Sequence, residues 1–110
     1  MSLLRRPVVV QIDGKVSWVV SRDPDSKGWV GVCPPLNLTA EGDTFEELNK
    51  SQIEAMALLF ADLFAEGELE AFLRRNHWAA ALPKPGTKAK FDMPFEMRTD
   101  SVERMMGALT

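Results

Sequence analysis

Residues 25–48 constrain the fold more than any other part of the sequence. They join two short apolar runs, separated by Pro34 and Pro35, to a Gly-Asp-Thr corner that opens a long segment with helical periodicity. Thr44 is suited to cap that helix, because Glu47 three positions later completes a capping box. The stretch therefore predicts two strands that lead into a helix, which is an α+β arrangement.

Two further strands are expected before this stretch. Residues 7–12 are rich in valine, and residues 15–21 alternate between apolar and polar side chains. The Asp13-Gly14 pair between them is a strong hairpin signal, so we expect the two strands to pair antiparallel to each other. With the strands at 29–33 and 36–40, this predicts a three- to four-stranded antiparallel sheet.

The helix that begins at Thr44 carries a broad apolar arc, which we expect to pack on the sheet. Gly67 is expected to end it, and residues 68–76 to form a second, short helix. The expected arc consists of Phe45, Leu48, Ile53, Met56, Leu59, Phe60, Leu63 and Phe64.

A second surface is expected on the long helix, outside this arc. Leu58 lies well away from the arc, and the alanines near it make the second half of the helix apolar on nearly all sides. A helix that is apolar on both sides usually has a second neighbour. We therefore predict an oligomer or partner interface at Glu54, Leu58, Ala61, Asp62 and Ala65.

The C-terminal part differs in pattern from the rest of the chain. Residues 79–110 are expected to form an irregular extension, with one added strand candidate over 91–95 after a Pro-Gly turn and either a short helix or a mobile tail over 101–109. This extension shows no separate DNA-binding domain. At 110 residues, the whole chain is expected to be a single domain.

Charge is unevenly distributed along the chain. Residues 41–70 hold nine acids and one base, a net charge of −8, which leaves +5 for the remainder of a chain whose total is −3. A surface built for nucleic acid needs clustered Lys and Arg, so DNA binding is not expected. The acidic segment is either a solvated helix face or a docking surface for a basic partner.

Catalytic and metal-binding patterns are not expected in this sequence. The single cysteine, Cys33, and the single histidine, His77, supply no metal-ligand spacing, and Asp13, Asp23 and Asp25 fall in expected turns. No cofactor, metal or catalytic residue is therefore predicted. The apolar runs are too short to span a bilayer, so we expect a cytoplasmic protein with no membrane association.

A family resemblance rests on three motifs and the long helix that follows them. Gly-Trp-Val-Gly-Val at 28–32, Pro-Pro-Leu at 34–36 and Gly-Asp-Thr-Phe-Glu-Glu-Leu at 42–48 resemble the HicB antitoxin family, over roughly residues 16–64. The resemblance implies a partial ribonuclease H-like domain that has lost nuclease residues. It also implies a partner, a small basic RNA-cleaving toxin of the HicA type, which the antitoxin binds and neutralises.

The sequence also departs from that family. HicB antitoxins commonly carry a C-terminal DNA-binding domain, whereas here the chain after Trp78 is short and proline-rich. We therefore expect a lone, non-enzymatic and homo-oligomeric HicB-like interaction module. Two alternatives stay open: an orphan structural module without a toxin, and a divergent metal-dependent nuclease that uses Asp23 or Asp25.

Overall fold

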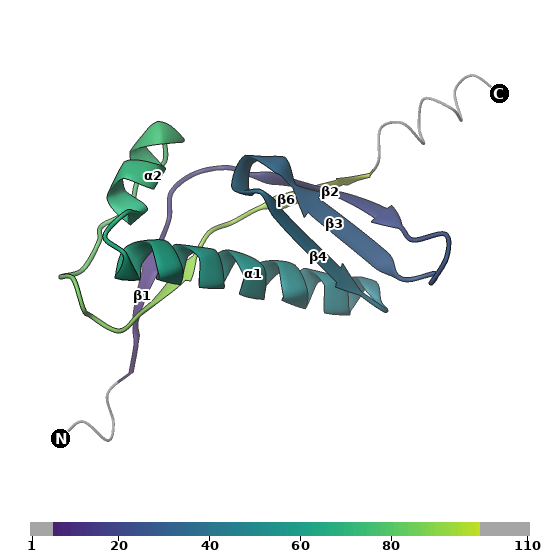
Figure 1. Cartoon of the computed structure of the whole chain (residues 1–110), viewed down its shortest axis with the longest axis horizontal. Coiled ribbons are helices and arrows are strands. Elements are labelled where there is room, and N and C mark those ends of the chain that lie inside the picture. Colours follow the sequence, from purple (N-terminus) through teal and green to yellow (C-terminus); the bar gives the residue numbers. More distant parts are fainter. Residues whose placement is uncertain (1–5, 100–110) are drawn as a thin grey trace. The chain divides into compact units, whose positions relative to one another are not determined.

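The computed structural model of this chain describes residues 6–99, and its elements are labelled in Figure 1. The strands are β1 (Val8–Gln11), β2 (Ser17–Arg22), β3 (Trp29–Cys33), β4 (Leu38–Gly42), β5 (Ala89–Asp92) and β6 (Glu96–Thr99). The helices are α1 (Phe45–Ala65), α2 (Leu69–Arg75) and the short 3-10 helix η2 (Pro34–Leu36). The expected α+β class, with one long and one short α-helix, is confirmed.

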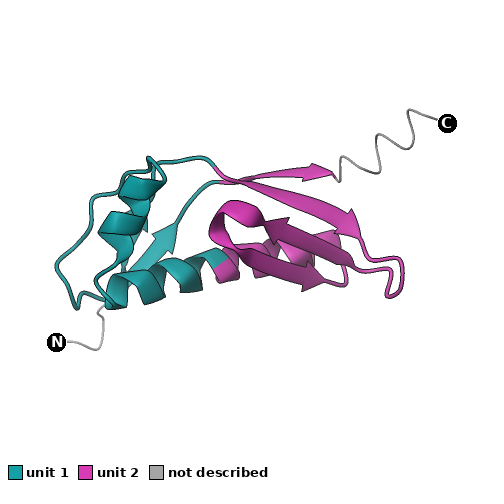
Figure 2. Ribbon diagram, turned by 45° about the horizontal axis from the view of Figure 1, so that its top comes forward, with its two compact units in different colours: residues 1–15, 56–94 teal, residues 16–55, 95–110 magenta. Residues whose placement is uncertain are grey.

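The described chain divides into two compact units, coloured separately in Figure 2. Unit 1 takes residues up to 15 and residues 56–94, whereas unit 2 takes residues 16–55 and those from 95 onward. The boundary falls inside α1, so this one helix contributes residues to both units.

Unit 2 contains a four-stranded sheet in the order β4-β3-β2-β6. The β2–β3 and β3–β4 pairs are antiparallel as expected, but β6 pairs with β2 in parallel, so the sheet is mixed rather than wholly antiparallel. The first half of α1 covers one face, where Trp18 and Leu48 are fully buried. On the opposite face, Val19 and Val32 are 38% and 41% exposed.

The expected hairpin at Asp13-Gly14 is wrong. Strand β1 pairs in parallel with β5 to form the two-stranded sheet of unit 1, and β2 belongs to the other sheet. Asp13 instead exchanges backbone hydrogen bonds with Ala79, with N···O distances of 2.7 and 3.0 Å. Gly14 serves close packing rather than a turn, since a Cβ there would lie 2.4 Å from Cδ1 of Trp78.

The C-terminal extension is not irregular throughout. The expected single strand over 91–95 is replaced by β5 and β6, which belong to different sheets and are separated by a short non-strand segment. Phe91 and Met93 are each only 4% exposed, so the alternation identified core positions although it misplaced the strand. The short helix or tail expected over 101–109 lies outside the described residues.

Helix α1 buries a narrower row of side chains than the broad apolar arc that the sequence predicts. Its buried positions are Leu48, Gln52, Met56 and Phe60, spaced four residues apart. Phe45 and Ile53, expected in the core, are 47% and 45% exposed. Residues four apart lie on one helix face, and here only that row is covered deeply.

The ends of the helices follow local signals. Gly67, with φ of +75°, ends α1 as expected, because glycine adopts the left-handed conformation without a Cβ clash. After α2 the left-handed residue is His77, with φ of +61°, one residue beyond the expected end of this helix at residue 76. Asn76 donates a hydrogen bond from Nδ2 to the carbonyl of Phe72, at 2.8 Å.

The expected cap at the start of α1 is confirmed and gives a first prediction. The Glu47 amide donates to Oγ1 of Thr44 at 3.1 Å. Thr44→Ala should lower the free energy of unfolding by about 1 kcal/mol, because the amide loses its acceptor. Chemical denaturation measures the change, and Thr44→Ser, which keeps the hydroxyl, is the matched control. Equal losses in both variants would contradict a capping role.

Candidate functional site

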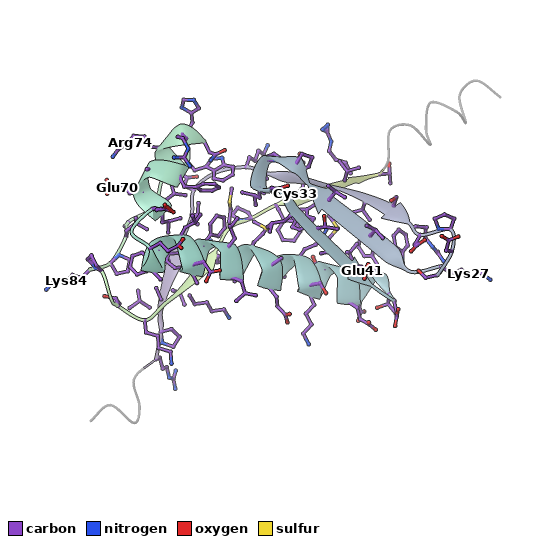
Figure 3. All side chains as sticks on the ribbon, in the orientation of Figure 1. Lys27, Cys33, Glu41, Glu70, Arg74 and Lys84 are labelled. Carbon is purple, nitrogen blue, oxygen red and sulfur yellow. The ribbon has the colours of Figure 1, made fainter. Side chains whose placement is uncertain are left out.

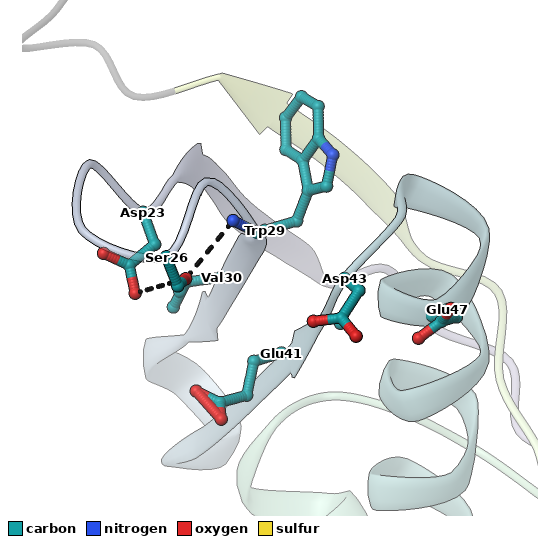
Figure 4. A pocket seen from close by; sticks show the side chains of 9 residues that line it. Asp23, Ser26, Trp29, Val30, Glu41, Asp43 and Glu47 are labelled. Carbon is teal, nitrogen blue, oxygen red and sulfur yellow. Dashed lines mark hydrogen bonds between the residues drawn. The ribbon is translucent and has the colours of Figure 1, made fainter.

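The strand-to-helix corner of unit 2 surrounds a pocket of about 410 Å³ (Figure 4). The turn between β2 and β3, the start of β3, the end of β4 and the first turn of α1 each contribute to its wall. We call this the acidic corner. Its lining residues are Asp23, Ser26, Gly28, Trp29, Val30, Glu41, Gly42, Asp43 and Glu47.

Asp23 is held in place by the turn that it opens. Its two carboxylate oxygens accept hydrogen bonds from the Asp25 amide and the Ser26 hydroxyl, each at 3.0 Å. The bond from the Asp25 amide is the main cause that lowers the pKa of Asp23, and the bond from Ser26 adds to it. Asp23 is therefore charged at neutral pH, and its orientation toward the pocket is fixed.

Trp29 supplies an aromatic surface to the same pocket. Its ring packs edge-to-face on Phe45, with centroids 5.3 Å apart and planes at 80°. The guanidinium carbon of Arg22 lies 5.0 Å from the Trp29 ring centroid, within cation–π distance. Arg22 also donates to the carbonyl of Lys27 at 3.2 Å. The indole is thus fixed from two sides.

Gly42 lets β4 pass directly into the helix. A Cβ at this position would lie 2.4 Å from the backbone nitrogen of Leu48, a contact that only glycine avoids. The close approach brings Glu41, Asp43 and Glu47 to the pocket from a short piece of chain. The Gly-Asp-Thr motif therefore shapes the acidic corner as well as starting the helix.

No base is among the residues that line the acidic corner, and Arg22 lies next to it, against the Trp29 ring. Within residues 6–99, the ion pair found is that of Arg74 with Glu70, at 3.0 Å on α2 (Figure 3). Four like charges around one pocket repel one another and attract cations. The pocket is suited to a positively charged group of a partner.

No group of three or more His, Cys, Asp or Glu side chains within residues 6–99 could hold a metal ion. Cys33 is fully buried, and burial raises the pKa of its thiol. Both oxygens of Asp23, one of the two nuclease candidates, already accept hydrogen bonds within the turn.

The predicted interface residues lie on the outward side of α1. Leu58 is 66% exposed, Glu54, Asp62 and Ala65 are exposed, and Ala61 is half-buried. Ala61 and Ala65 also line an apolar groove of about 370 Å³ in unit 1. We call this the α1–β5 groove, and its other lining residues are Phe64, Gly86, Thr87, Lys88, Ala89 and Phe91.

Two features of these surfaces escaped the sequence reasoning. The sequence does not show that Trp29 and Asp23 face one cavity. It places Asp23 in a turn, and gives it a further role only under the nuclease alternative. The wall of the α1–β5 groove at Thr87 and Lys88 depends on β5 pairing with β1. The alternation of apolar and polar residues around Phe91 indicates a strand, but it does not show which other strand pairs with it.

Comparison with protein-family models, with curated proteins and with solved structures found no match to this chain. The resemblance to HicB antitoxins therefore stays a prediction. Within residues 6–99, no helix is long and apolar enough to cross a membrane.

Proposed function

We propose that this chain is a non-enzymatic interaction module whose acidic corner binds a basic protein. The observation that carries the proposal is the set of four carboxylates around one pocket with no base among its lining residues. The fixed Asp23 and Trp29 side chains add support, because a surface that is already ordered loses less entropy when it binds. Residues 41–55, the part of the acidic segment that belongs to unit 2, hold five acids and one base, which extends the attraction beyond the pocket.

The resemblance to HicB antitoxins suggests a particular partner, a small basic RNA-cleaving toxin of the HicA type. Under this proposal the module acts in the cytoplasm by covering the toxin and uses no cofactor. Lysine and arginine side chains, which a ribonuclease uses to hold RNA phosphates, are also the groups that the acidic corner attracts.

The test is calorimetry of the full chain with the purified product of a neighbouring gene that encodes a short basic protein. We expect a Kd of about 1 µM or tighter, which weakens as salt rises because exposed charges are screened. Absence of binding at micromolar concentrations would contradict the proposal.

A matched pair of variants locates the binding site. The triple variant Glu41→Gln, Asp43→Asn and Glu47→Gln should raise the Kd by about tenfold or more. The control, Glu66→Gln with Glu68→Gln and Glu70→Gln, removes the same number of charges from acids that do not line the corner and should change the Kd by less than about threefold. Equal effects of the two variants would mean that general charge, rather than the acidic corner, binds the partner. Magnesium-dependent RNA cleavage that is lost in Asp23→Asn would instead favour a nuclease.

A further inference from the structure

The outer side of α1 presents an exposed leucine beside a groove. Leu58 is the most exposed large hydrophobic side chain in the described part of the chain, at 66%. Ala61 and Ala65 follow it on the same side of the helix, and they line the α1–β5 groove. The exposed leucine thus lies one helical turn from an apolar groove, and the two can serve as the two halves of a contact surface.

The α1–β5 groove has an ordered floor and one charged wall. Phe64 from α1 and Phe91 from β5 pack with ring centroids 5.4 Å apart. Ala61 and Ala65 leave the groove open because their side chains are short, and its volume is about 370 Å³. Lys88 lies on the β5 side, and it is exposed. The groove therefore fits an apolar side chain that is accompanied by a carboxylate.

This chain itself presents such a group. Leu58 is followed one helical turn later by Asp62, which is exposed on the same side of α1. A twofold axis repeats every contact, so a surface that carries both a protruding side chain and its receiving groove complements itself. We propose that a second copy of this chain occupies the α1–β5 groove, with Leu58 of each copy inserted beside Ala61 and Ala65 of the other.

Charge favours a second copy over the basic partner of the proposed function. Lys88 on the groove wall repels lysine- and arginine-rich segments, whereas Asp62 of a second copy pairs with it. The dimer contact and the acidic corner use different residues, so this inference does not rest on the proposed function.

The mass of the full chain in solution tests the contact. Light scattering at roughly 100 µM, where an interface with a micromolar Kd is populated, should give twice the chain mass of 12.3 kDa. Leu58→Glu should return the mass to that of one chain. The control is Ile53→Glu, because Ile53 is also exposed on α1, at 45%, but lies off the side that carries Leu58. A monomeric native chain, or a Leu58→Glu variant that stays dimeric, would overturn the proposal.

A charge exchange tests the pairing of Lys88 with Asp62. Each single variant, Lys88→Glu or Asp62→Lys, should weaken the dimer by about tenfold, and the double variant should recover most of the loss. Circular dichroism of each variant separates loss of the dimer from loss of the fold. Failure of the double variant to recover would overturn the pairing. Leu58→Glu should bind the basic partner as the native chain does, which keeps this test distinct from that of the acidic corner.

Discussion

Phe60→Ala is expected to lower the free energy of unfolding by about 3–5 kcal/mol, the usual cost of emptying a fully buried phenylalanine site. Phe60 is 0% exposed, and its ring packs at 6.4 Å from that of Phe72 on α2. Truncation removes the apolar surface from the core and leaves a cavity that the neighbouring side chains fill only in part. Urea denaturation followed by circular dichroism measures the loss.

Phe45→Ala on the same helix is the matched control. Phe45 is 47% exposed and keeps one edge-to-face contact, with Trp29. Its truncation should cost only about 1–2 kcal/mol, because much of its surface already faces water. Equal losses for the two variants would contradict the narrow buried row of α1 and would support the broader arc that the sequence predicts.

Gln52→Met is expected to raise the free energy of unfolding by about 1–3 kcal/mol. Gln52 is 0% exposed, and within residues 6–99 neither atom of its side-chain amide has a hydrogen-bond partner. A buried amide without partners loses its hydration and gains nothing in return. Methionine has a similar length and flexibility, so it fills the same space beneath Gly31 without the polar group.

Gln11→Met is the control for Gln52→Met, because Gln11 is exposed on β1. It should change the free energy of unfolding by less than about 0.5 kcal/mol. Thermal and urea denaturation of both variants give the comparison. A Gln52→Met variant less stable than the native chain would show that the amide makes a stabilising bond, and the buried-polar argument would then be wrong.

The sequence predicted those features that neighbouring residues control. Thr44 starts α1, and Gly67 ends it, because capping and left-handed conformations depend on a few consecutive residues. The antiparallel pairing of β3 with both β2 and β4 also agrees with expectation, since these strands follow one another along the chain. The acidic composition of residues 41–70 was likewise evident from the sequence.

The burial of Gln52 could not be predicted from hydrophobic periodicity. Gln52 lies on the side of the helix that the expected apolar arc occupies, but it is not one of the apolar residues that define the arc. Periodicity counts apolar residues, so it passes over a polar one that shares their side of the helix. The exposure of Phe45 and Ile53 escaped prediction for the converse reason, since an apolar residue becomes core only where another element covers it.

By itself, the sequence determined where α1 begins and ends, that β3 pairs antiparallel with β2 and β4, and where acidic charge gathers. The tertiary structure decided that Asp13-Gly14 is not a hairpin, because β1 pairs in parallel with β5 and β2 pairs in parallel with β6. It also decided which residues surround the acidic corner and the α1–β5 groove. The physical reason is that capping and turn preferences act over a few residues. Parallel pairing, by contrast, joins residues as distant as Val8 and Ala89, and it has no local signature.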